Sequence, residues 1–99
     1  MVSGSPQEGH ARHIRAYVFE NFVMTGVPED VPLDESLVDL EILDSFGIVE
    51  LATWVESEFK ITIADDEIVR ENFGSISRIA GFALRKQGIA SGIESQSGT

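Results

Sequence analysis

The stretch LDSFGIVEL, residues 43–51, decides how this chain is interpreted. It places Ser45 directly after Asp44, at the start of a segment whose apolar residues recur at helical spacing. The stretch contains no histidine, lysine or other group that would activate a serine as a nucleophile. An exposed serine in this setting is better suited to being modified than to performing catalysis.

Composition narrows the possible classes of protein. The 99 residues are enough for one domain with a small core, and 17 acidic against 7 basic residues give a net charge of −10. This charge argues against nucleic acid and for partners with basic surfaces; the alternative is that the acidity only keeps a small protein soluble. There is no cysteine, and no apolar run reaches the roughly 18 residues of a membrane helix. We therefore expect a soluble, cytoplasmic protein that binds neither nucleic acid nor membranes.

An amphipathic helix of about four turns is predicted near the N-terminus, where Ile14, Val18 and Phe22 recur at four-residue spacing. It should end near Gly26, and a long loop over residues 27–43 should follow. We expect the leucines of this loop to enter the core while its carboxylates stay in water. These leucines are Leu33, Leu37, Leu40 and Leu43.

The second helix should run from about Asp44 and Ser45 to Phe59 and present two different faces. The expected core stripe is Ile48, Leu51, Ala52, Val55 and Phe59. A second, partly apolar face consists of Phe46, Val49, Glu50, Thr53 and Ser57. Because the helix does not need this second face for its own packing, the pattern predicts a contact surface there. Trp54 is expected in ordinary side packing.

The C-terminal half predicts an extended link at residues 61–63, a short third helix over residues 65–70 and a last helix over residues 75–86. Gly88 would follow as the stop. The predicted fold is therefore all-α, with three longer helices and one short helix.

Two tails flank this domain. Residues 1–9 and 88–99 are rich in serine and glycine, a composition typical of flexible segments. The predicted folded domain therefore covers residues 10–87.

These features together resemble the acyl carrier protein family over roughly residues 10–87. The resemblance rests on Asp44 and Ser45, on Glu50 and Leu51 at the family's spacing after the serine, on the order of the helices and on the acidity. It implies an acyl-carrier-like bundle in which Ser45 bears covalent 4′-phosphopantetheine from coenzyme A. The thiol of that group would carry acyl intermediates as thioesters. A helix N-terminus suits such a site, because its unpaired N–H groups and positive dipole end favour a phosphodiester.

The resemblance also implies a docking surface and a set of partners. The docking residues would be Asp44, Phe46, Val49, Glu50, Thr53 and Glu56. The partners would be a phosphopantetheinyl transferase and acyl-loading enzymes, acyltransferases, ketosynthases or tailoring enzymes with basic docking surfaces. Taken singly, each acid is equally well explained as part of a solvated helix face.

The expected function is that of a monomeric, non-catalytic carrier in secondary-metabolite biosynthesis, such as that of polyketide antibiotics. Two departures from the family pattern bear on this. Ile42 lies where many carriers have glycine, and Gly47 lies where many have an acid. Both departures resemble specialised carriers, including those of polyketide extender units and aminoacyl groups. An aminoacyl or peptidyl carrier of a non-ribosomal peptide pathway is the alternative within the class.

Other classes fit the sequence less well. A serine hydrolase needs a base and an oxyanion hole, yet the histidines, His10 and His13, lie near the N-terminus and no Gly-x-Ser-x-Gly motif exists. Two histidines do not make a metal site, and residues 65–67 lack the spacing and glycine of a calcium loop. We therefore expect no metal and no catalytic residues. A non-carrier, acidic helical interaction module is the alternative outside the carrier class.

Overall fold

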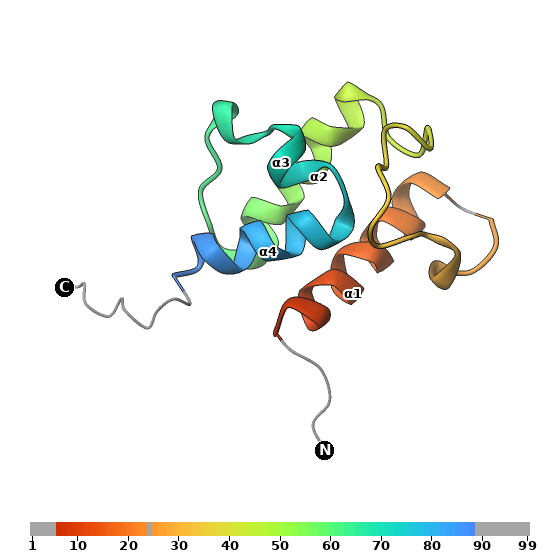
Figure 1. The fold of residues 1–99 in the computed structure, drawn as a ribbon, viewed down its shortest axis with the longest axis horizontal. Helices are drawn as coiled ribbons and strands as arrows, with labels where there is room; N and C mark the ends of the chain where they lie inside the picture. Colours follow the sequence, from red (N-terminus) through yellow and green to blue (C-terminus); the bar gives the residue numbers. More distant parts are fainter. Residues whose placement is uncertain (1–5, 24, 89–99) are drawn as a thin grey trace, which may run out of the picture.

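The computed structural model describes residues 6–23 and 25–88 of the chain, and over these ranges the regular structure is entirely helical (Figure 1). The elements in chain order are α1 (Pro6–Val18), the π-helical turn η1 (Phe19–Val23), the 3₁₀ turn η2 (Pro28–Asp30), α2 (Ser45–Phe59), the 3₁₀ turn η3 (Asp65–Glu67), α3 (Arg70–Phe73) and α4 (Ile76–Lys86). This arrangement confirms the predicted all-α fold with a long connection before α2. Within the described residues, no helix has the length and apolar character needed to cross a membrane.

The core forms where α1, α2 and α4 meet. Helix α4 contacts both α1 and α3, and α3 directly precedes it in the chain (Figure 1). The largest fully buried side chains come from all three long helices and from the loop. They are Ile14, Val18, Leu37, Leu51, Val55, Ile76 and Ile79. The predicted core stripe of α2 is buried except for Ile48, which is half-buried against the same cluster.

The long loop is anchored largely as predicted. Leu37 and Leu43 are buried and Leu33 is half-buried, but Leu40 is 44% exposed, so its predicted core position is wrong. The reason is a tight reversal of the chain. The Leu37 carbonyl accepts the N–H groups of both Ile42 and Leu43, which leaves Leu40 on the outer side of the turn.

Three predicted helix boundaries need correction. The first helix begins at Pro6, so residues 6–9 of the expected tail are helical, while residues 1–5 and 89–99 lie outside the described residues. Its last predicted turn is the π-helical η1, which shifts Phe22 away from the core stripe of α1. The expected short helix over residues 65–70 is instead two separate pieces, η3 and α3. The extended backbone at Val69 (φ −129°, ψ 167°) separates them.

The predicted last helix is confirmed, with α4 beginning at Ile76. The Ser75 hydroxyl caps it by accepting the Arg78 N–H at 3.2 Å, and the Leu33 carbonyl accepts the Ser77 N–H at 2.8 Å. The hydrogen bond between Leu33 and Ser77 holds the long loop against α4. The C-terminal end of the loop places Asp44 at the start of α2.

Candidate functional site at the start of α2

Asp44 forms the N-cap of α2, and Ser45 is the first residue of the helix. The backbone of Asp44 is extended, its Oδ1 accepts the Gly47 N–H at 2.7 Å and its carbonyl accepts the Ile48 N–H at 2.9 Å. The cap is therefore supplied entirely by Asp44. Ser45 is exposed, and its hydroxyl has no hydrogen-bond partner among the described residues. The serine is consequently available for reaction without loss of a structural contact.

The end of the helix suits a negatively charged group. Among the described residues, no acceptor is paired with the backbone N–H groups of Ser45 and Phe46, because Asp44 occupies only the next two. Unpaired N–H groups and the positive end of the 15-residue helix favour an anion such as a phosphodiester. The residues present therefore fit 4′-phosphopantetheine linked at Ser45.

The second face of α2 forms one wall of an open groove of about 530 Å³, here called the α1–α2 groove. From α2 come Phe46, Val49, Glu50, Thr53, Trp54 and Ser57, and from α1 and η1 come Tyr17, Asn21 and Phe22. The structure thus brings Phe46, Val49, Glu50 and Thr53 together as predicted. Phe46 is 73% and Val49 53% exposed, which is unusual for large apolar side chains.

Sequence reasoning missed the opposite wall of this groove. Phe22 was expected in the core, and no role was assigned to Asn21. The π-helical turn changes which side chains share a face after Val18, and a four-residue apolar spacing gives no sign of that change. Phe22 therefore faces α2 and lines the α1–α2 groove.

A second open groove, of about 500 Å³, lies on the loop side of Ser45. It is lined by Val38, Glu41, Ile42, Leu43, Asp44 and Gly47, and Phe22, Phe46 and Glu50 border both grooves. Neither groove has a lysine or arginine in its lining, whereas Glu41, Asp44 and Glu50 contribute three carboxylates. This surface is complementary to a basic partner.

Aromatic packing closes the inner side of the α1–α2 groove. Tyr17 stacks on Trp54 with ring centroids 4.1 Å apart and an angle of 13° between the rings, which confirms side packing for Trp54. Partial burial, followed by the charge of Glu50, raises the pKa of Tyr17 above its usual value of 10.0. The Tyr17 hydroxyl therefore stays protonated in neutral solution.

The two histidines pack around the same helix. His13 lies 2.7 Å from the Glu58 carboxylate, and its ring centroid is 5.3 Å from that of Trp54. His10 is half-buried against Phe59, with the ring centroids 4.4 Å apart. Each histidine therefore contributes to packing between α1 and α2.

Local contacts explain why glycine occupies position 47. A Cβ at this buried position would lie 3.2 Å from Leu43 Cδ2 and 3.4 Å from both Asp44 Oδ1 and Phe22 Cε1. Glycine therefore lets Phe22 close against the first turn of α2. Any larger residue at this position would require a small shift of the Leu43 side chain.

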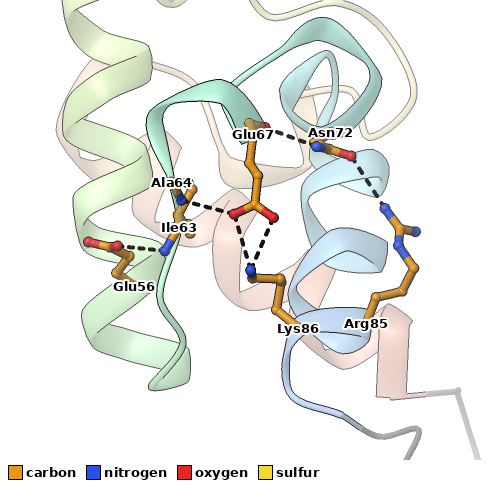
Figure 2. Close-up of polar contacts among 7 residues, drawn as sticks. All are labelled: Glu56, Ile63, Ala64, Glu67, Asn72, Arg85 and Lys86. Atoms are coloured by element: carbon orange, nitrogen blue, oxygen red, sulfur yellow. Dashed lines mark hydrogen bonds and ion pairs between the residues drawn. The ribbon is translucent and has the colours of Figure 1, made fainter.

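The structure gives Glu56 an internal contact. Its side chain is half-buried, and Oε2 accepts the Ile63 N–H at 2.7 Å (Figure 2). Figure 2 also shows Glu67 accepting the Ala64 N–H at 2.9 Å and binding Lys86 Nζ at 3.0 Å. Unlike Glu50, Glu56 does not line either groove beside Ser45. Its predicted docking role stays a prediction.

Comparison with known proteins gives a consistent result. The family described as "Phosphopantetheine attachment site" matches residues 24–83. The D-alanyl carrier protein of Streptococcus suis (strain 05ZYH33) is 39% identical over 62 residues, which cover 63% of this chain and 76% of that protein. The D-alanyl carrier protein of Streptococcus pyogenes serotype M5 (strain Manfredo) is 36% identical with the same coverage. The solved structure of KstB-PCP(apo) has a TM-score of 0.67 and 35% identity, covering 86% of this chain and 90% of that one.

Proposed function

Because the chain belongs to the phosphopantetheine attachment family, whose members are non-catalytic carriers with covalent 4′-phosphopantetheine, we propose that Ser45 is its attachment residue. This proposal rests on one observation at the start of α2, namely that one residue caps the helix and a different residue exposes its hydroxyl. Asp44 supplies the cap, and the exposed Ser45 hydroxyl is left without an internal partner among the described residues. A modifying enzyme can then reach the hydroxyl without unfolding the helix.

The residues around Ser45 support holding the group at this position. The free N–H groups of Ser45 and Phe46 would face the phosphate, and the positive end of α2 would favour its charge. The prosthetic thiol supplies the thioester bond, which this chain cannot form with its own side chains because it has no cysteine. In this proposal the protein itself positions the arm and presents it to other enzymes.

Carriers of this family meet a phosphopantetheinyl transferase and enzymes that load or use the carried group. We propose that these partners dock on Asp44, Phe46, Val49, Glu50 and Thr53. The two exposed apolar side chains would give contact area, and the carboxylates would steer basic partners toward Ser45. The proposed location is the cytoplasm, where coenzyme A is available for the modification.

For the cargo, we propose an aminoacyl group. The support comes from the D-alanyl carrier proteins, whose names specify an aminoacyl cargo and which match this chain at 36–39% identity. A role in polyketide biosynthesis, as predicted from the sequence, stays a prediction.

The proposed attachment site is tested by incubating the protein with coenzyme A and a broad-specificity phosphopantetheinyl transferase, then measuring the intact mass. The wild type should gain one phosphopantetheine and Ser45→Ala none. Ser57→Ala is the matched control, because Ser57 is an exposed serine on the same helix, and it should gain the group normally. A wild type that stays unmodified with several transferases would instead favour the non-carrier interaction module.

A further inference from the structure

The polar groups of the α1–α2 groove are mostly hydrogen-bond acceptors. Its polar lining consists of the Glu50 carboxylate, the Asn21 amide and the hydroxyls of Tyr17, Thr53 and Ser57. No lysine, arginine or histidine lines it. Apart from the amide and hydroxyl hydrogens, the lining offers oxygen acceptors, so the groove is suited to a ligand rich in hydrogen-bond donors.

Several of these acceptors have no partner among the described residues. Asn21 Nδ2 donates to the Tyr17 carbonyl at 2.9 Å, whereas Asn21 Oδ1 accepts no hydrogen bond from any described residue. Thr53 Oγ1 donates to the Val49 carbonyl at 3.0 Å and keeps its lone pairs. Glu50 has no ion-pair partner within the described residues. A charged donor entering the groove would therefore find unpaired acceptors.

The inner side of the groove offers an apolar surface beside a carboxylate. The stacked rings of Tyr17 and Trp54 and the side chain of Glu50 all line it. Tyr17 remains neutral, so the only formal charge in the lining is that of Glu50. The groove can thus accept methylene or methyl groups on its rings and one positive charge at its carboxylate.

The groove begins beside the proposed attachment residue. Phe46, the neighbour of Ser45, lines its near end. Glu50 lies five residues along α2 and Trp54 nine, which corresponds to a rise of about 7.5 and 13.5 Å at 1.5 Å per residue. An extended pantetheine chain is longer than this rise. A group carried on Ser45 is therefore able to reach both residues without leaving the same molecule.

We propose that the α1–α2 groove binds the ammonium end of an aminoacyl group carried on Ser45, with Glu50 as its counter-ion and the Tyr17–Trp54 pair as its apolar support. This inference rests on the proposed function and adds the place on this chain where the free amine of the aminoacyl cargo is bound. Uncharged acyl groups lack the charge that Glu50 recognises. The groove therefore distinguishes aminoacyl from simple acyl cargo.

The test compares two cargoes that differ only in the amine. Alanyl and propionyl groups are each attached through an amide bond to an arm whose terminal thiol is replaced by an amine, so that neither group is lost by hydrolysis, and the mass of each product is measured first. The readout is the NMR position of the Trp54 indole N–H, which is unambiguous because the chain has one tryptophan. The alanyl form should move this signal relative to the protein with the ordinary thiol-ended arm, and the propionyl form should not.

Substitution identifies the counter-ion. Glu50→Gln should reduce the alanyl-dependent shift by about tenfold or more, since a charge-assisted hydrogen bond is lost. Glu41→Gln is the matched control, because Glu41 lines the other groove and should leave the shift unchanged. Equal shifts from alanyl and propionyl, or no shift from alanyl, would overturn the inference. If no arm can be attached to Ser45, the mass measurement shows that the proposed function itself has failed.

Discussion

The two ends of α2 use acidic side chains in opposite ways. Around its first turns, Glu41 and Glu50 face open grooves without ion-pair partners among the described residues, and Asp44 holds only the helix cap. Around its last turn, Glu56 binds the Ile63 N–H and Glu58 lies 2.7 Å from His13. In the link that follows, Glu67 binds Ala64 and Lys86 (Figure 2).

This difference separates carboxylates bonded within the fold from those proposed to meet a partner. A carboxylate that satisfies a half-buried backbone N–H stabilises the fold, whereas an unpaired carboxylate at the surface adds little stability and is free to meet a partner. The acidic residues of the chain are therefore of at least two kinds, and the net charge alone does not distinguish them. Substitutions at the two ends of the helix should have separable effects.

The largest difference is expected between Glu56→Ala and Glu50→Ala. Removing Glu56 leaves the half-buried Ile63 N–H without its acceptor and should lower the free energy of unfolding by about 1–3 kcal/mol. Removing exposed Glu50 should change it by less than about 0.5 kcal/mol. Urea unfolding followed by circular dichroism measures both values. Equal losses for the two variants would contradict the division of the helix into a structural and a functional end.

Asp44 tests the cap itself. Asp44→Ala should destabilise the protein by about 1 kcal/mol, because the Gly47 N–H loses its acceptor, whereas Asp44→Asn keeps a side-chain oxygen and should lose less. The same unfolding measurement compares them. If the two variants lose equal stability, then the charge of Asp44 and not its capping oxygen is what stabilises α2.

At acidic pH, a smaller effect on stability is expected from Glu67. The Ala64 N–H, and then Lys86, lower the pKa of Glu67 below its usual value of 4.5. Because the pKa is lowered in the folded state, the contribution is fully present above pH 4.5 and is lost as the pH falls through the folded-state pKa. Glu67→Gln should therefore show a weaker loss of stability below pH 4.5 than the wild type. If the free energy of unfolding falls in parallel for the two proteins as the pH is lowered, Glu67 is not the source of this pH dependence.

Much of the fold and of the site follows from residue pattern. The spacing of Leu51, Val55 and Phe59 identified the core face of α2, and the remaining positions identified the face that lines the groove. The π-helical turn at residues 19–23 could not be predicted, because it changes only one turn and leaves the four-residue spacing of apolar residues as it is. The internal bond of Glu56 was missed for a similar reason. It depends on how the link after α2 folds back, which periodicity does not report.

The central claim is that one unpartnered hydroxyl, at the capped start of α2, carries the prosthetic group. The most direct test is fragmentation mass spectrometry of the unmutated protein after phosphopantetheinylation, which assigns the added mass to a residue. We predict that the entire addition lies on Ser45 and none on Thr53 or Ser57, the other two hydroxyl-bearing residues of α2. An addition located on any residue other than Ser45 would contradict the account.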